Sequence, residues 1–123
     1  MNGIKKEQGA NVNQILGALT RYHAVSIIMG NATAVTENGR KVVKAGTPLA
    51  GDMTRRETAF TVGSGADVVG LLLHDVDVTE GPANGTCLAG GVVNVDRLDA
   101  TTAALITAEV KAALKGKIEF IAD

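Results

Sequence analysis

The chain has 123 residues, enough for one domain with a hydrophobic core but small for an enzyme with an enclosed active site. Its formal net charge is −1 and 20% of its residues are charged, so it lacks the basic excess that binding to a nucleic-acid backbone requires. One tyrosine, two phenylalanines and no tryptophan leave few platforms for stacking on bases or sugars.

The cysteine content and the hydropathy of the chain limit the cellular compartment in which the protein is expected. The single cysteine, Cys87, cannot form an internal disulfide, and no stretch approaches the roughly 18 apolar residues that cross a bilayer. The first residues lack the apolar core of a secretory signal. We therefore expect a protein made in a cytoplasm, with no membrane and no nucleic acid among its partners.

Residues 1–22 are expected to form an N-terminal arm. Residues 1–14 are polar and show no sustained period, so they have no core of their own. Apolar side chains then recur at helical spacing: Val12, Ile15, Leu16, Leu19 and Tyr22. Gly17 weakens a helix there by about 1 kcal/mol relative to alanine. Two alternatives stay open, a short helix over residues 12–22 or an extended arm that packs on a partner.

Residues 23–123 are predicted to form a single β-rich domain that begins with short strands. The predicted strands are Ala24–Met29, Thr33–Thr36, Arg40–Lys44 and Thr58–Val62. Asn38-Gly39 tolerates positive φ angles and predicts a tight hairpin between the second and third of them. Pro48 interrupts the ladder after the third strand because proline has no N–H to donate.

The longest apolar run lies in a predicted β-hairpin at the centre of the chain. Its first arm, Val68–Val78, is β-branched and leucine-rich without helical periodicity. Its second arm, Thr86–Val95, ends in alternating apolar and polar residues. The polar stretch Thr79–Gly85 contains Pro82 and reads as the hinge between the arms.

One helix is predicted over residues 99–115, followed by a last strand, Lys117–Ala122. Asp99 can accept hydrogen bonds from the first turn, and Gly116 can close the last one. The predicted buried stripe consists of Ile106, Val110, Ala113 and Leu114. The fold class is therefore mixed and β-rich (α+β): a small β-sandwich or barrel-like domain of short antiparallel strands, with one helix and an extended N-terminal arm.

His74, Asp75 and Asp77 are the strongest candidates for acid–base catalysis or metal binding, because these residue types supply most such groups. Strand parity separates them, since Asp75 and Asp77 share one face and His74 lies on the other. A solvated or interface role is the favoured reading. A small metal-dependent or acid–base enzyme that uses these three residues is kept as an alternative.

Neither Cys87 nor the glycine-rich segments show the pattern of a catalytic or ligand-binding site. Cys87 has no basic neighbour or helix N-terminus to activate it, so it is predicted to be a small buried apolar residue. Gly63-Ser64-Gly65 lacks the lysine that a phosphate-binding loop requires. Gly90-Gly91 is predicted to be a bulge or a close strand crossing. We therefore predict no catalytic residue, no metal ligand and no cofactor.

Three pieces in this order resemble the head decoration proteins of tailed phages, the lambda type and its relatives. They are Lys44–Leu49, Val69–Leu73 and the segment Val93–Leu98, followed by a helix and a short final strand. The similarity covers about two-thirds of the chain, from Ala45 to the C-terminus, and lies in the order and spacing of the pieces. The chain differs in a longer N-terminal part, with an added strand pair over residues 24–44.

The resemblance implies a structural protein that binds the outside of an assembled phage head and cements neighbouring shell subunits. Its implied partners are the major capsid protein of the same virus and further copies of itself, as a trimer at local threefold positions. On this reading the protein is no enzyme, and its place is the exterior of the virion. The arm then supplies the expected capsid-binding residues: Val12, Ile15, Leu16 and Leu19. A surface-exposed β binding module on a virion is a further alternative.

Overall fold

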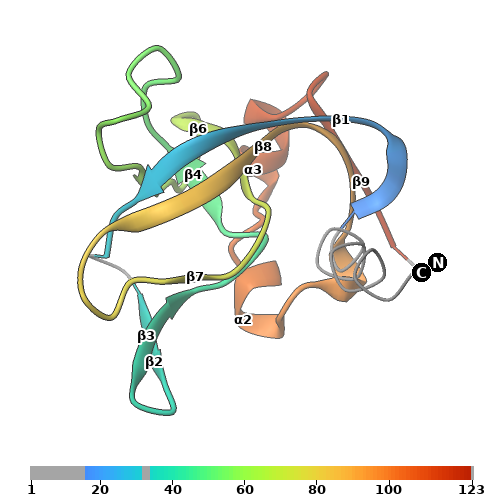
Figure 1. The fold of residues 1–123 in the computed structure, drawn as a ribbon. Coiled ribbons are helices and arrows are strands. Elements are labelled where there is room, and N and C mark those ends of the chain that lie inside the picture. The colour runs from blue at the N-terminus through green and yellow to red at the C-terminus, as the bar shows by residue number, and fades with distance from the viewer. Residues whose placement is uncertain (1–15, 32–33, 123) are drawn as a thin grey trace, which may run out of the picture.

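The computed structural model describes residues 16–31 and 34–122, which form two sheets and a few short helices (Figure 1). The larger sheet has the order β1-β8-β6-β4-β5, and β9 pairs with β8 beside this path. Its strands are β1 (Leu16–Met29), β4 (Pro48–Ala50), β5 (Thr61–Val62), β6 (Val68–Leu72), β8 (Ala83–Asn94) and β9 (Ile118–Ile121). The smaller sheet consists of β2 (Val35–Glu37), β3 (Arg40–Val43) and β7 (Val76–Asp77).

The ladders between these strands are antiparallel except that of β8 and β9, which is parallel. A parallel neighbour requires a crossover connection. Here the crossover contains a 3₁₀ turn (Val95–Arg97) and the helices α2 (Ala100–Ala103) and α3 (Ala108–Ala113). The expected mixed, β-rich class with short antiparallel strands is confirmed.

The predicted hairpin at Asn38-Gly39 is confirmed. The two residues have φ angles of 54° and 79°, the left-handed region that a tight two-residue turn needs. Strands β2 and β3 pair on either side of this turn, with Thr36 opposite Lys41. This turn therefore follows from a local signal that needs no support from the rest of the fold.

Strand β1 is longer than predicted and includes residues that the helical alternative claimed. It pairs with β8 from Leu16, opposite Val93, to Met29, opposite Ala83. A helix over residues 12–22 is therefore wrong from residue 16 onward. Residues 16–22 are extended, but they belong to a strand that pairs with β8 of the same chain and not with an external partner. The reason is tertiary: β8 supplies backbone partners that outweigh a helical pattern already weakened by Gly17. Residues 12–15 lie outside the described residues.

The central segment also differs from the prediction. Its first arm breaks after Leu72, so that β6 joins the larger sheet and β7 the smaller one. Ala45 donates its backbone N–H to the Asp75 carboxylate at 2.7 Å, which fixes the chain between the two strands. The second arm begins at Ala83, inside the expected hinge, because Asn84 and Gly85 pair with β1.

The predicted single helix over residues 99–115 is two helices. Asp99 caps α2, as expected, by accepting from the Thr101 backbone N–H at 3.2 Å. Thr107 then has an extended backbone, and its hydroxyl accepts from the Val110 N–H at 3.3 Å, which begins α3 as a second N-cap. A threonine hydroxyl favours a cap over a helix interior, and this local competition divides the helix.

Two apolar clusters make up the core. One lies beneath α3 and includes Val110 and Leu114, both fully buried, with Ile106 and Ala113 packed against it. The four residues of the predicted stripe therefore pack on the core, although Ile106 precedes α3 and Leu114 is its C-cap. The other cluster surrounds Phe60, Met29 and Leu49 and includes Cys87, which is buried as predicted. Burial of these side chains is the main term that stabilises the fold.

Candidate functional site

The expected capsid-binding residues fall partly within the described chain. Leu16 and Leu19 belong to β1, whereas Val12 and Ile15 lie outside the described residues. Leu16 is opposite Val93 of β8, so this end of the predicted arm is part of the larger sheet. The four residues are therefore not one external arm, because the last two belong to a strand.

Strand β1 lies at the edge of the larger sheet (Figure 1). One side of the strand pairs with β8. Beyond this ladder, the described chain adds an isolated bridge from Met29 to Phe60 and a hydrogen bond of 3.0 Å from the Arg56 guanidinium to the Ser26 carbonyl oxygen. From Ala24 to Met29 the register is regular, whereas the register shifts three times between Leu16 and Ala24. Such irregularities blunt an edge against uncontrolled pairing and leave individual backbone groups open to a specific partner.

Side-chain exposure falls along β1 toward its C-terminal end. Ile27 and Met29 are buried in the core, while Tyr22 is 39% exposed and His23, Ala24 and Ser26 are also exposed. An exposed tyrosine provides a large contact area with a hydroxyl at its tip, a combination that suits a protein interface. The regular half of β1 thus anchors the strand, and the residues just before it face outward.

The structure does not bring His74, Asp75 and Asp77 together as one polar site. Asp75 accepts from the Ala45 N–H, and Asp77 faces Arg40 and Thr79. The Nδ1 atom of His74 is buried and has no hydrogen-bond partner among the described residues. Across residues 16–31 and 34–122, no group of three or more His, Cys, Asp and Glu side chains could hold a metal ion.

Asp77 is engaged in a surface network. Its carboxylate accepts from the hydroxyl and from the backbone N–H of Thr79, the latter at 2.9 Å, and it forms an ion pair with Arg40. These contacts lower the pKa of Asp77 from 3.8 to about 2, with the Thr79 hydroxyl as the largest cause and Arg40 as a smaller one. Asp77 is therefore held as a carboxylate, which suits a structural role better than proton transfer.

The Cys87 thiol has low nucleophilic reactivity near neutral pH. Burial raises the pKa of its thiol to about 11, so the nucleophilic thiolate is scarce near neutral pH. The thiol lies within the apolar cluster around Phe60. Its role is packing, as the sequence suggested.

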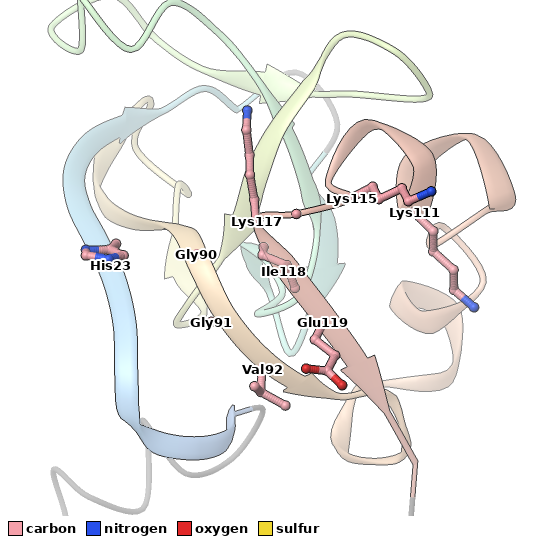
Figure 2. A pocket seen from close by; sticks show the side chains of 10 residues that line it. His23, Gly90, Gly91, Val92, Lys111, Lys115, Lys117, Ile118 and Glu119 are labelled. Atoms are coloured by element: carbon pink, nitrogen blue, oxygen red, sulfur yellow. The ribbon is translucent and has the colours of Figure 1, made fainter.

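Two surface hollows were missed by sequence reasoning. One, of about 640 Å³, lies between the β2–β3 turn and the segment after β7, around Arg40, Asp77 and Pro82. The other, of about 610 Å³, lies where β1, β8 and the start of β9 meet (Figure 2). Gly90-Gly91 and the lysines near the end of α3 were visible in the sequence, but nothing local placed them beside His23.

Comparison with protein-family models and with curated proteins finds no match for this chain. In the part of the chain that the structure describes, no helix has the length and apolar character needed to cross a membrane.

Proposed function

We propose that the protein is a structural decoration protein, which binds the outside of an assembled phage head and cements neighbouring subunits of the major capsid protein. The observation that carries this proposal is the edge strand β1, whose outer side is largely unpaired in the described chain. The polar, low-hydropathy residues 1–14 precede it directly. We propose that these residues add to the contact with the shell.

Strand addition is the mechanism that this edge supports. An extended segment of a shell subunit can donate and accept backbone hydrogen bonds along β1, as in β-augmentation. Tyr22 and the residues around it then contribute side-chain contacts next to the new ladder. A protein that bridges two neighbouring subunits binds them more tightly in the assembled shell, where their relative position is fixed, than when they are separate. Such binding stabilises the shell by mass action.

The dispersal of His74, Asp75 and Asp77 favours the structural reading over the enzymatic alternative. Asp75 fixes a backbone turn and Asp77 an ion pair, so neither is placed to act with the histidine. On the proposed function, a trimer at local threefold positions would bring three β1 edges to one site on the shell. This stoichiometry rests on the resemblance to the lambda-type proteins.

The test is co-sedimentation with capsids of the virus that encodes the chain. The full chain should sediment with intact capsids, not with unassembled shell subunits, and should protect capsids against heat. A variant lacking residues 1–14 should keep a melting temperature within about 5 °C of the full chain, since those residues have no core of their own. It should nevertheless bind capsids at least about tenfold more weakly.

A matched control keeps the length of the arm and changes only its charge. Lys5→Glu with Lys6→Glu should weaken capsid binding less than the deletion, if apolar and backbone contacts dominate. Failure of the full chain to co-sediment with intact capsids would overturn the proposed function. A truncated chain that binds and protects as well as the full chain would show that residues 1–14 are not the contact.

A further inference from the structure

The hollow where β1, β8 and β9 meet owes its shape to two glycines. Gly90 lies opposite His23 in the β1–β8 ladder, and Gly91 has a φ angle of 147°, which disfavours other residues. A Cβ atom at Gly90 would lie 3.4 Å from both His23 Cδ2 and the Lys117 carbonyl oxygen. These are ordinary van der Waals distances, so a methyl group at Gly90 would contact His23 and Lys117 without a clash.

Three lysines lie on the α3–β9 side of this hollow (Figure 2). Lys111, Lys115 and Lys117 line it together with a single acidic residue, Glu119, although the whole chain has a net charge of −1. Within the described chain, neither Lys115 nor Lys117 has a carboxylate within ion-pair distance. Lys111 lies over the Phe120 ring, with its Nζ atom 6.0 Å from the ring centroid. Among the described residues, Lys115 and Lys117 therefore have no carboxylate partner and can pair with one supplied by another molecule.

The lysine side chains point in different directions in Figure 2 and do not converge on one point. Such an arrangement does not form a cradle for a small ion, but it matches several carboxylates spread along an extended chain. Strands β1 and β9 pair with opposite edges of β8, so the hollow lies on the face that these three strands form. An extended segment could cross this face with its carboxylates toward the lysines.

We propose that this hollow binds an extended acidic segment of a partner protein. The carboxylates of that segment would lie against Lys115 and Lys117, and its backbone would cross Gly90 and Gly91. The inference does not depend on the proposed function, because it requires only a partner with such a segment. It also places this contact on the face formed by β1, β8 and β9, apart from the outer edge of β1.

The test titrates the full chain against a fluorescein-labelled peptide of alternating glutamate and valine residues. Reversal of two charges, Lys115→Glu with Lys117→Glu, should weaken binding at least about tenfold, and Lys115→Arg with Lys117→Arg should stay within about threefold of wild type. The matched control, Lys41→Glu with Arg55→Glu, changes the net charge equally at exposed residues outside the hollow. It should also stay within about threefold.

A second variant tests the shape of the hollow. Gly90→Val should fill it and weaken peptide binding, with a melting curve to show that the domain is folded. Equal weakening by the charge-reversal pair and by the control pair would overturn the proposal, because only net charge would then matter. So would the absence of peptide binding to wild type, or equally tight binding of a thymidine oligonucleotide with the same response to the variants.

Discussion

Gly70 on β6 and Gly90 on β8 are both buried glycines of the larger sheet, yet a side chain would clash with its neighbours at Gly70 and not at Gly90. A Cβ atom at Gly70 would lie 2.5 Å from the Leu88 carbonyl oxygen and 2.6 Å from Cys87 Sγ, closer than real Cβ contacts allow. At Gly90 the nearest atoms are 3.4 Å away. Gly70 permits β6 and β8 to pack closely, whereas Gly90 lines a surface hollow. A glycine within a strand therefore does not by itself indicate close packing or a hollow.

The largest expected effect is at Gly70. Gly70→Ala should lower the free energy of unfolding by about 2–3 kcal/mol, because the new methyl group meets backbone that cannot rotate away. Urea denaturation followed by circular dichroism measures this change. An unchanged midpoint would show that β6 and β8 can separate without loss, and that the two glycines do not differ in the way described.

A smaller effect distinguishes the contributions of the two atoms that a Cβ atom at Gly70 would contact. Cys87→Ala removes Sγ but leaves the Leu88 carbonyl oxygen in place. The double variant Gly70→Ala with Cys87→Ala should therefore be less destabilised than the sum of the single variants, by about 1 kcal/mol. Denaturation of all four proteins completes the cycle. Strict additivity would mean that the backbone contact alone accounts for the cost at Gly70.

Gly90→Ala should change the free energy of unfolding by less than about 1 kcal/mol, in either direction. The methyl group meets only ordinary contacts, and alanine loses less conformational entropy on folding than glycine does. The same denaturation experiment applies. A loss as large as that at Gly70 would mean that the hollow is a packing requirement of the sheet.

The smallest effect concerns a surface contact away from both glycines. The folded-state pKa of Asp77 is lowered to about 2. Its stabilising contribution is therefore present above pH 4 or so and is lost as the pH falls from about 4 to about 2. Asp77→Asn should lower the melting temperature slightly at pH 7, by less than about 3 °C, because the group is exposed. The difference between the two proteins should shrink near pH 2, and a difference that stays constant would contradict this assignment.

Several features could be predicted because their causes lie within a few residues. Asn38-Gly39 adopts the positive φ angles that its residue types favour, and the Asp99 side chain reaches its own helix N-terminus. Burial of Val110 and Leu114 follows from their spacing, and burial of Cys87 from its apolar neighbours. The predicted capsid contacts at Val12, Ile15, Leu16 and Leu19 stay predictions, and the first two of these residues lie outside the described residues.

The sequence by itself determined the β-rich class, the tight turn at Asn38-Gly39, the start of α2 and the burial of Val110 and Leu114, because each depends on local geometry or on periodicity. Only the tertiary structure decided that Leu16–Tyr22 is strand, that β6 and β7 belong to different sheets, and that β9 runs parallel to β8. It also placed His23 beside Gly90 and the lysines around β9. These outcomes depend on which distant strand supplies the backbone partners, and a strand's own residues do not carry that information.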